Sequence, residues 1–205
     1  MDMKDFARQM KRKRKELDQA MRRTLPVAIG RMAKDHFQEG FRQGGFIDGG
    51  LHKWLATRRQ LSDSKAAAAN YGPLLSGRRH LFSSIYYTPS DYRVRVGNSL
   101  LYAALHNEGG TVHPTVTPKM RKFAWAMAYK AAGIRQSKGG KQKKKNRAAR
   151  MEANPEAQMW KRLALTRKKK LTVRIPQRRF LGESRELDGK IEERIEKEIR
   201  SILNS

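Results

Sequence analysis

The sequence predicts an α+β protein in which a small antiparallel sheet packs against helices. Residues 83–87 and 91–96 flank a turn that contains Pro89, and apolar and polar residues alternate over 92–96, which together are typical of a β-hairpin. Residues 170–175 alternate in the same way and predict a third strand. Residues 187–202 carry apolar side chains at intervals of three or four, which predicts an amphipathic helix. We therefore expect one sheet, built from the hairpin and the third strand, covered by this helix and by a helix at 118–132.

The first 40 residues predict a long N-terminal helix that forms an arm. Apolar residues recur along one face of this segment. They are Phe6, Met10, Leu17, Met21, Leu25, Ile29, Met32 and Phe37. The basic run 11–15 interrupts the face, and Pro26, which lacks a backbone N–H, predicts a kink or break. The apolar face either packs on the protein's own domain or docks on a neighbouring subunit, and the sequence leaves both open.

A glycine-rich segment follows the predicted helix. Residues 40–50 contain five glycines, which predicts a loop. Phe41, Phe46 and Ile47 lie within this segment, and Trp54 follows it. Because clustered apolar side chains outside a core usually mark interfaces, we expect Phe41, Phe46 and Trp54 to contact another subunit.

Residues 134–150 predict a flexible basic insertion. The segment holds eight Lys or Arg, two glycines and no acidic residue, a composition typical of disorder. The predicted organisation is therefore an N-terminal arm (1–40), an α+β core (41–133 and 151–205) and this insertion.

The protein is strongly basic. It carries 46 Lys and Arg against 19 acidic residues, a formal net charge of +27, which indicates a polyanionic partner, a strongly acidic protein partner, or both. Aromatic residues are not interleaved with the basic runs, so contact with nucleic acid would involve the phosphate backbone rather than stacked bases. The runs at 11–15, 135–150 and 167–170 are each able to neutralise phosphates. The residues that we expect to contact a polyanion are Lys138, Lys141, Lys143, Lys144, Lys145, Arg147, Arg178 and Arg179.

Several kinds of chemistry lack the residues that they need. Cysteine is absent, which excludes disulfides, thiolate zinc sites and cysteine nucleophiles. The five histidines are scattered without the spacing of a metal site, and the glycines form no phosphate-binding loop. No apolar run is long enough to span a membrane, and the first residues do not resemble a signal peptide. We therefore expect a protein that is not an enzyme, needs no cofactor or metal, and stays in the cytoplasm or in a particle assembled there.

A short helix is predicted at 100–108, ended by the Gly-Gly pair at 109–110. His106, Asn107 and Glu108 form its last residues. His106 and Glu108 are two positions apart, so their side chains point in different directions and do not make an acid–base pair. We expect these three residues to cap the helix, to fix the glycine turn, or to form part of a subunit interface.

Three stretches of the chain, taken in order, resemble the motifs of one protein family. They are Leu74–Gly77 with Leu81 and Ser83–Ile85, then Tyr102–Gly110, then Ile175–Gly182. Together they resemble the virion morphogenesis, or tail-completion, proteins of tailed bacteriophages. Phe37–Trp54 fits more loosely, and the basic segment 134–150 is not part of the motif pattern.

The resemblance implies a structural virion protein that completes the tail or neck at the head–tail junction. It implies a homo-oligomeric ring, with a hexamer as the expected number of copies, around the DNA channel and in contact with other neck and tail proteins. It places the protein in the virion after assembly in the host cytoplasm. Contact with the packaged DNA is left open.

Two other functions stay open at this point. A non-catalytic nucleic-acid-binding protein of ribosomal or nucleoid type would explain the charge, but not the ordered motifs and the large α+β portion. A scaffold or chaperone of assembly would be absent from the finished particle. Presence in purified virions would separate the structural virion protein from both alternatives.

Overall fold

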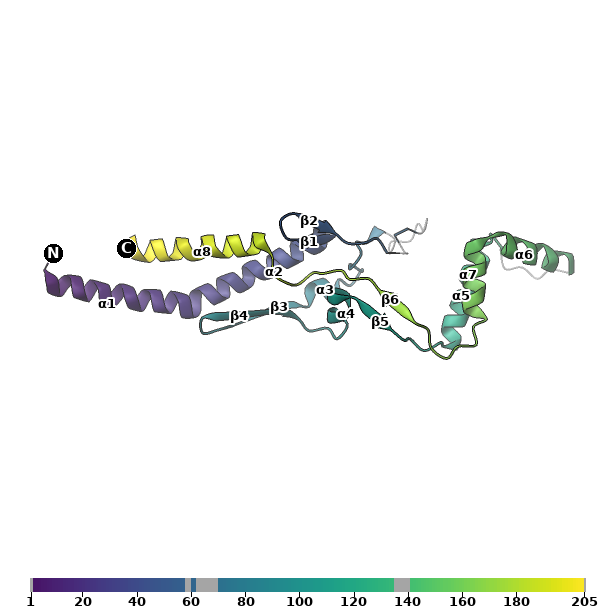
Figure 1. Cartoon of the computed structure of the whole chain (residues 1–205), viewed down its shortest axis with the longest axis horizontal. Helices are drawn as coiled ribbons and strands as arrows, with labels where there is room; N and C mark the ends of the chain where they lie inside the picture. The colour runs from purple at the N-terminus through teal and green to yellow at the C-terminus, as the bar shows by residue number, and fades with distance from the viewer. Residues whose placement is uncertain (1, 58–59, 62–69, 135–140, 205) are drawn as a thin grey trace. The chain divides into compact units, whose positions relative to one another are not determined.

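The structure is a computed structural model, and it describes residues 2–57, 60–61, 70–134 and 141–204 (Figure 1). It divides into two compact units. Unit 1 comprises Met1–Gly110 with Ile175–Ser205, and unit 2 comprises Thr111–Arg174. The described residues form helices and three two-stranded sheets, so the predicted α+β class is confirmed.

The two units differ from the arm, core and insertion that we predicted. The N-terminal helix contributes Ala33, Phe37 and Phe41 to the core of unit 1, so its second half is not a separate arm. The expected insertion, 134–150, lies within unit 2 together with the residues on both sides of it. The predicted boundaries therefore do not separate the units.

The N-terminal segment is helical, as predicted. Its elements are α1 (Met3–Gln19), the π-helical turn η1 (Ala20–Thr24) and α2 (Leu25–Gln43). In the π-helical turn, the Leu25 N–H bonds to the carbonyl of Ala20, five residues back. Pro26 has no N–H to donate to Arg22 and its ring crowds that carbonyl, so a wider turn relieves the clash. Figure 1 shows the helix axis changing direction here, which confirms the irregularity predicted at Pro26.

The glycine-rich segment forms a hairpin rather than a loop. Strand β1 (Gly45–Ile47) pairs antiparallel with β2 (Leu51–Lys53). Gly44 ends α2 with a φ of 72°, a left-handed conformation that reverses the chain. A Cβ atom at Gly40 would lie 2.6 Å from the carbonyl oxygen of Gly45. Glycine at position 40 therefore lets the hairpin lie directly on the last turn of α2.

This hairpin buries the aromatic residues that we expected at a subunit interface. Phe41 is 1% exposed, and Phe46 and Trp54 are also buried in the core of unit 1. Phe41 packs edge-to-face against Trp54 and against Phe180, with ring centroids 5.2 Å apart in both pairs. The expectation that these residues lie outside the core is wrong, because the reversal at Gly44 folds their segment back onto α2.

The predicted β-hairpin is confirmed as β3 (Ile85–Ser90) and β4 (Arg93–Asn98), and it packs against α2. Pro89 lies in β3 rather than in the turn, which is formed by Asp91 and Tyr92. Both strands of a two-stranded sheet are edge strands, so the missing N–H of a proline can face outward.

The expectation of a single sheet is wrong. Strand β6 (Val173–Ile175) pairs with β5 (Gly110–Val112) and not with the hairpin. The helix predicted at 118–132 belongs to unit 2, where it packs against α6 (Lys141–Ala153) and α7 (Pro155–Ala164). A three-residue strand such as β5 is too short to show alternation, so the sequence did not reveal the partner of β6.

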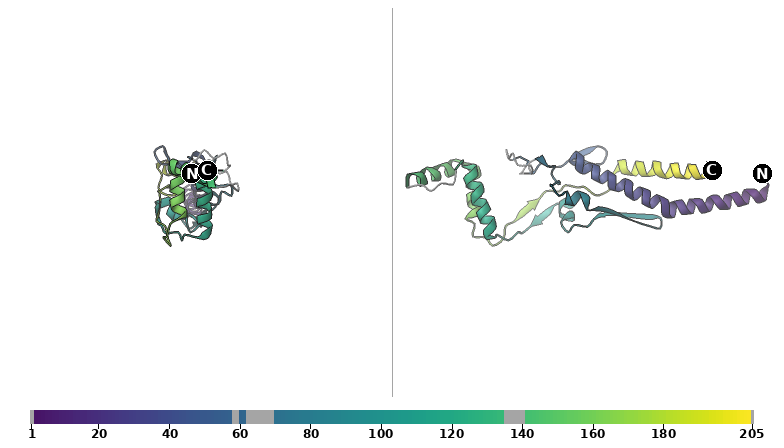
Figure 2. Two further views of the ribbon diagram at one scale, coloured as in Figure 1. Left: turned by 90° about the vertical axis from the view of Figure 1, so that its right-hand side faces the viewer. Right: turned by 180° about the vertical axis from the view of Figure 1, so that it is seen from behind.

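The predicted C-terminal helix is confirmed as α8 (Arg185–Asn204), which runs alongside α1 and α2 (Figures 1 and 2). Its end is held by Lys13, whose Nζ donates to the carbonyls of Ile202 (3.0 Å) and Leu203 (2.6 Å). Lys13 is 7% exposed, although it belongs to the basic run 11–15. The ammonium group bonds carbonyls of the last turn of α8 and stabilises the negative end of the helix.

Unit 2 is built from α5 (Pro118–Ala131), α6 (Lys141–Ala153) and α7 (Pro155–Ala164). Helices α5 and α7 pack together, and both bury alanines, whose small side chains allow close approach. Asn154 joins them, because its side-chain oxygen accepts the N–H of Ala157 while its amide donates to the carbonyl of Ala131. One side chain therefore caps the start of α7 and the end of α5.

Helix α6 corrects the expectation of a disordered basic insertion. Residues 141–150 are helical, and residues 135–140 lie outside the described residues. Lys, Gln, Arg and Ala are good helix formers, whereas repulsion between like charges four residues apart costs only about 0.2–0.5 kcal/mol per pair. Helix propensity therefore outweighs the repulsion that favoured disorder.

Candidate functional site

We call Tyr102–Gly110 the central motif and Ile175–Gly182 the third motif. The central motif ends in a sharp turn. It forms α4 (Ala103–Glu108), followed by Gly109 with a φ of 75°. A Cβ atom at Gly109 would lie 2.8 Å from the backbone nitrogen of Gln177. Only glycine fits here without displacing Gln177, and the close approach brings the central motif against the third one.

Hydrogen bonds join these two motifs. The carbonyl of His106 accepts the N–H of Arg178 at 2.8 Å. The side-chain oxygen of Asn107 accepts the N–H groups of Phe180 and Leu181, both at 2.9 Å. The structure thus gives Asn107 a role that we did not expect, which is to fix the segment that follows β6.

The two arginines of the third motif are engaged within unit 1. Arg178 is 7% exposed, and its guanidinium donates from Nε and Nη2 to the carbonyl of Leu55 at 3.1 and 3.0 Å. The guanidinium of Arg179 lies 4.6 Å from the ring centroid of Phe46 and donates to the carbonyl of Glu183. Arg178 is therefore not placed to contact a polyanion, and Arg179 is only half-exposed.

His106 and Glu108 lie in different surroundings. The ring of His106 is half-buried, and its Nδ1 is buried with no hydrogen-bond partner among the described residues. Burial and the nearby charge of Arg178 lower the pKa of His106, so the ring is neutral at neutral pH. The side chain of Glu108 is exposed, and its place in a subunit interface stays a prediction.

Two exposed apolar residues beside this motif were missed by the sequence reasoning. Leu101 is fully exposed and Tyr102 is 43% exposed, just before α4. The neighbouring Leu100 packs against the core of unit 1. The pair of leucines at 100–101 could have predicted that one of them is exposed, because adjacent side chains in a turn rarely enter the same core.

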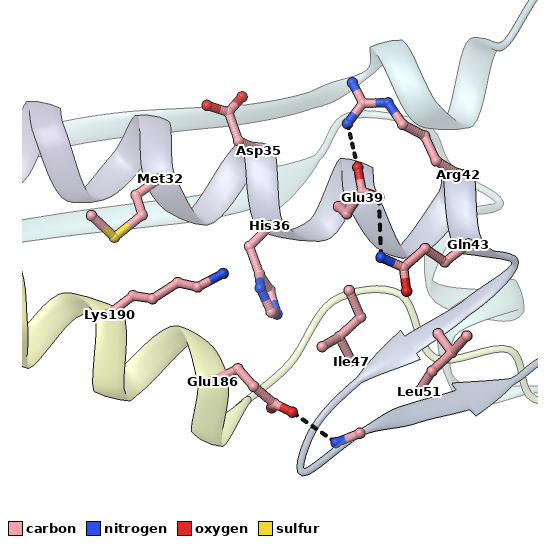
Figure 3. Close-up of a pocket in the computed structure, with 11 residues that line it drawn as sticks. Met32, Asp35, His36, Glu39, Arg42, Gln43, Ile47, Leu51, Glu186 and Lys190 are labelled. Carbon is pink, nitrogen blue, oxygen red and sulfur yellow. Dashed lines mark hydrogen bonds and ion pairs between the residues drawn. The ribbon is translucent and has the colours of Figure 1, made fainter.

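A groove of about 620 Å³ lies between α2, the β1–β2 hairpin and the start of α8 (Figure 3). Its charged lining includes Glu39, which accepts hydrogen bonds from Arg42 at 2.8 Å and Gln43 at 3.1 Å. Glu186 accepts the N–H groups of Gly49 and Gly50, and these bonds lower the pKa of its carboxyl group. The carboxylate of Glu39 is therefore engaged within α2, whereas that of Glu186 joins α8 to the hairpin turn.

A Ser–His pair lies beside the groove, and its geometry is structural. The Oγ of Ser184 lies 3.0 Å from Nε2 of His36, and Ser184 is 1% exposed. The same Oγ accepts the N–H of Leu187 and so caps the start of α8. Burial and the charge of Lys190 lower the pKa of His36. A hydroxyl that is buried and already acts as a helix cap cannot reach a substrate.

Metal and membrane sites are not found in the described part of the chain. No group of His, Asp and Glu side chains there is arranged to hold a metal ion. No described helix is long and apolar enough to cross a membrane.

The positive charge of the protein is concentrated in unit 2. Residues 111–174 contain 19 of the 46 Lys and Arg but only two acidic residues, Glu152 and Glu156. Exposed cations that form no ion pair with another described residue lie on α5, on α7 and in the segment that returns toward β6. We call the following group the unit 2 basic surface: Lys119, Lys122, Lys130, Arg162, Arg167, Lys168, Lys169 and Lys170.

This surface includes the basic run 167–170 noted in the sequence, but none of the eight residues that we expected to contact a polyanion. Helix α6 contains five of the predicted contacts, which are Lys141, Lys143, Lys144, Lys145 and Arg147. Lys138 lies outside the described residues. The cations of α5 were missed, although their positions three and eight residues apart place them on one helical face.

The chain was also compared with known proteins and protein families. Residues 2–200 match the phage virion morphogenesis family. No curated protein and no solved structure matches the chain significantly.

Proposed function

Because the chain belongs to the phage virion morphogenesis family and so takes part in building a phage virion, we propose that it completes the tail or neck at the head–tail junction. The observation that carries this proposal is the family match over residues 2–200. The structure supports a structural role, because the central and third motifs build unit 1 rather than line a reactive cleft.

The protein acts as a homo-oligomeric ring, with six copies expected, around the DNA channel and against other neck and tail proteins. Exposed apolar side chains support self-association. Met3, Phe6 and Met10 repeat at intervals of three and four on α1, and each is exposed. These residues, rather than the buried Phe41, Phe46 and Trp54, form the contact between copies in this proposal.

A phage with an early stop codon in this reading frame tests the function. It should accumulate separate heads and tails, and purified protein added to the extract should restore joining. The protein should then be present in the joined particles. Restored joining by a protein absent from the finished particles would identify an assembly chaperone instead.

A further inference from the structure

Unit 2 carries most of the excess charge in less than a third of the chain. With 19 Lys and Arg against two acids, its residues 111–174 account for +17 of the formal +27. The remaining 141 residues carry 27 basic and 17 acidic residues, and their side chains form the ion pairs of unit 1. With only two acidic residues, unit 2 can form few ion pairs between its own side chains.

The cations of α5 share one face. Lys119, Lys122 and Lys130 are exposed, whereas Ala124 and Ala128 on the opposite side are buried toward the core of unit 2. Eleven residues of helix span roughly 16 Å. A duplex presents about ten phosphate charges over that length. The α5 face is therefore long enough to meet several phosphates at once.

The basic run 167–170 is ordered next to the start of α5. The carbonyl of Lys169 accepts the N–H of Val116 at 2.8 Å, and the N–H of Leu171 donates to Pro114 at 2.9 Å. Thr115 and Lys170 form an antiparallel bridge between these bonds. Helix α5 begins at Pro118, so this pairing holds the run next to the start of the helix, where Lys119 lies.

We propose that unit 2 is a sequence-independent duplex-DNA-binding module that grips the phosphate backbone through the unit 2 basic surface. The duplex would be the DNA in the channel, so this proposal rests on the proposed function. Lysines predominate on this surface, and lysine is depleted at the cores of protein–protein interfaces. A lysine ammonium suits a phosphate as a point charge and carries no base-specific pattern.

The test uses the full-length protein and a fluorescent duplex of random sequence, with affinity measured by anisotropy over a series of KCl concentrations. One variant carries K119Q, K122Q and K130Q, and a second carries K168Q, K169Q and K170Q. The matched control removes three exposed charges from α1, which are Lys11, Arg14 and Lys15. Each phosphate contact contributes about 0.9 to the slope of log K against log salt.

We expect each unit 2 variant to flatten the slope by up to about 2.7 and to weaken binding equally for unrelated sequences, while the control changes the slope less. An equal effect of the control, or no binding by the unaltered protein, would overturn the proposal. Tighter binding to polyglutamate of equal charge would also overturn it, in favour of an acidic protein partner. Ring formation does not enter the measurement, so failure here would leave the proposed function standing.

Discussion

The side-chain oxygen of Asn107 accepts a hydrogen bond of 2.9 Å from the backbone nitrogen of Phe180, which lies 73 residues away in the sequence. The same oxygen accepts the N–H of Leu181. Phe180 in turn packs against Phe41 at the centre of the unit 1 core. One amide therefore connects the central motif to the segment that completes this core.

Replacing Asn107 tests this connection. Asn107→Ala leaves two partly buried N–H groups without their acceptor and should lower the free energy of unfolding by about 1–3 kcal/mol. Asn107→Asp is the matched control, because a carboxylate still accepts both bonds, and it should lose less. Urea unfolding followed by circular dichroism measures both. An equal loss of unfolding free energy in the two variants would show that the side-chain oxygen at position 107 does not stabilise the fold by accepting these bonds.

Lys13 offers a second test of the packing within unit 1. Lys13→Met keeps the apolar stem but removes the ammonium that caps α8, so the free energy of unfolding should fall by about 1 kcal/mol. Amide exchange should accelerate in the last turn of α8. Lys11→Met, at an exposed position of the same run, should leave both quantities close to those of the unaltered protein. Unchanged exchange at the end of α8 in Lys13→Met would contradict the capping role.

The stability of the protein should depend on pH through His36 and His106. Burial lowers the pKa of both rings in the folded protein. As the pH falls through the ordinary histidine pKa of about 6.5, the unfolded chain therefore binds more protons than the folded protein does. The free energy of unfolding should therefore be greatest above that pH and fall as the pH drops through it toward about 5.

His36→Gln combined with His106→Gln should flatten this dependence, even if the double variant is less stable at every pH. The carboxyl groups with lowered pKa values, such as that of Glu186, lose their contribution only at lower pH, as the pH falls below the ordinary carboxyl pKa of about 4.3. Denaturant unfolding at a series of pH values measures the slope. An unchanged slope between about pH 6.5 and 5 in the double variant would exclude the two histidines as its source.

Self-association should depend on the exposed apolar side chains of α1. Phe6→Asp with Met10→Asp places charges on that face and should shift the protein toward the monomer in size-exclusion chromatography with light scattering. The fold should be unaffected, because both side chains are exposed, Phe6 by 50%. Val27→Asp, another exposed apolar position of the same helical segment, is the control. An oligomer that withstands the double substitution would place the contact elsewhere.

The parts of the fold that the sequence predicted are those specified by local periodicity. Helices α5 and α8 and the β3–β4 hairpin each repeat their pattern over enough residues to be recognised. A kink or break was expected at Pro26 because a missing N–H acts on its immediate neighbours, and the π-helical turn lies just before this residue. Local chemistry alone decides such features.

The parts that could not be predicted depend on contacts distant in sequence. Phe46 and Trp54 looked exposed because five glycines surround their segment, yet Gly44 reverses the chain and buries them. Lys13 looked like one more solvated cation until the end of α8 was placed beside it. Arg178 appeared to be a polyanion contact, but its partner is the carbonyl of Leu55. In each case the deciding atom lies outside the segment that carries the pattern.

The most direct test of the central claim is an electron cryo-microscopy reconstruction of the neck in purified virions of the phage that encodes this chain. Our account predicts a ring of density between head and tail into which unit 1 fits, with unit 2 resolved next to DNA. A neck whose density is fully explained by other proteins, in particles that lack this chain, would contradict the claim that it is a structural part of the head–tail junction.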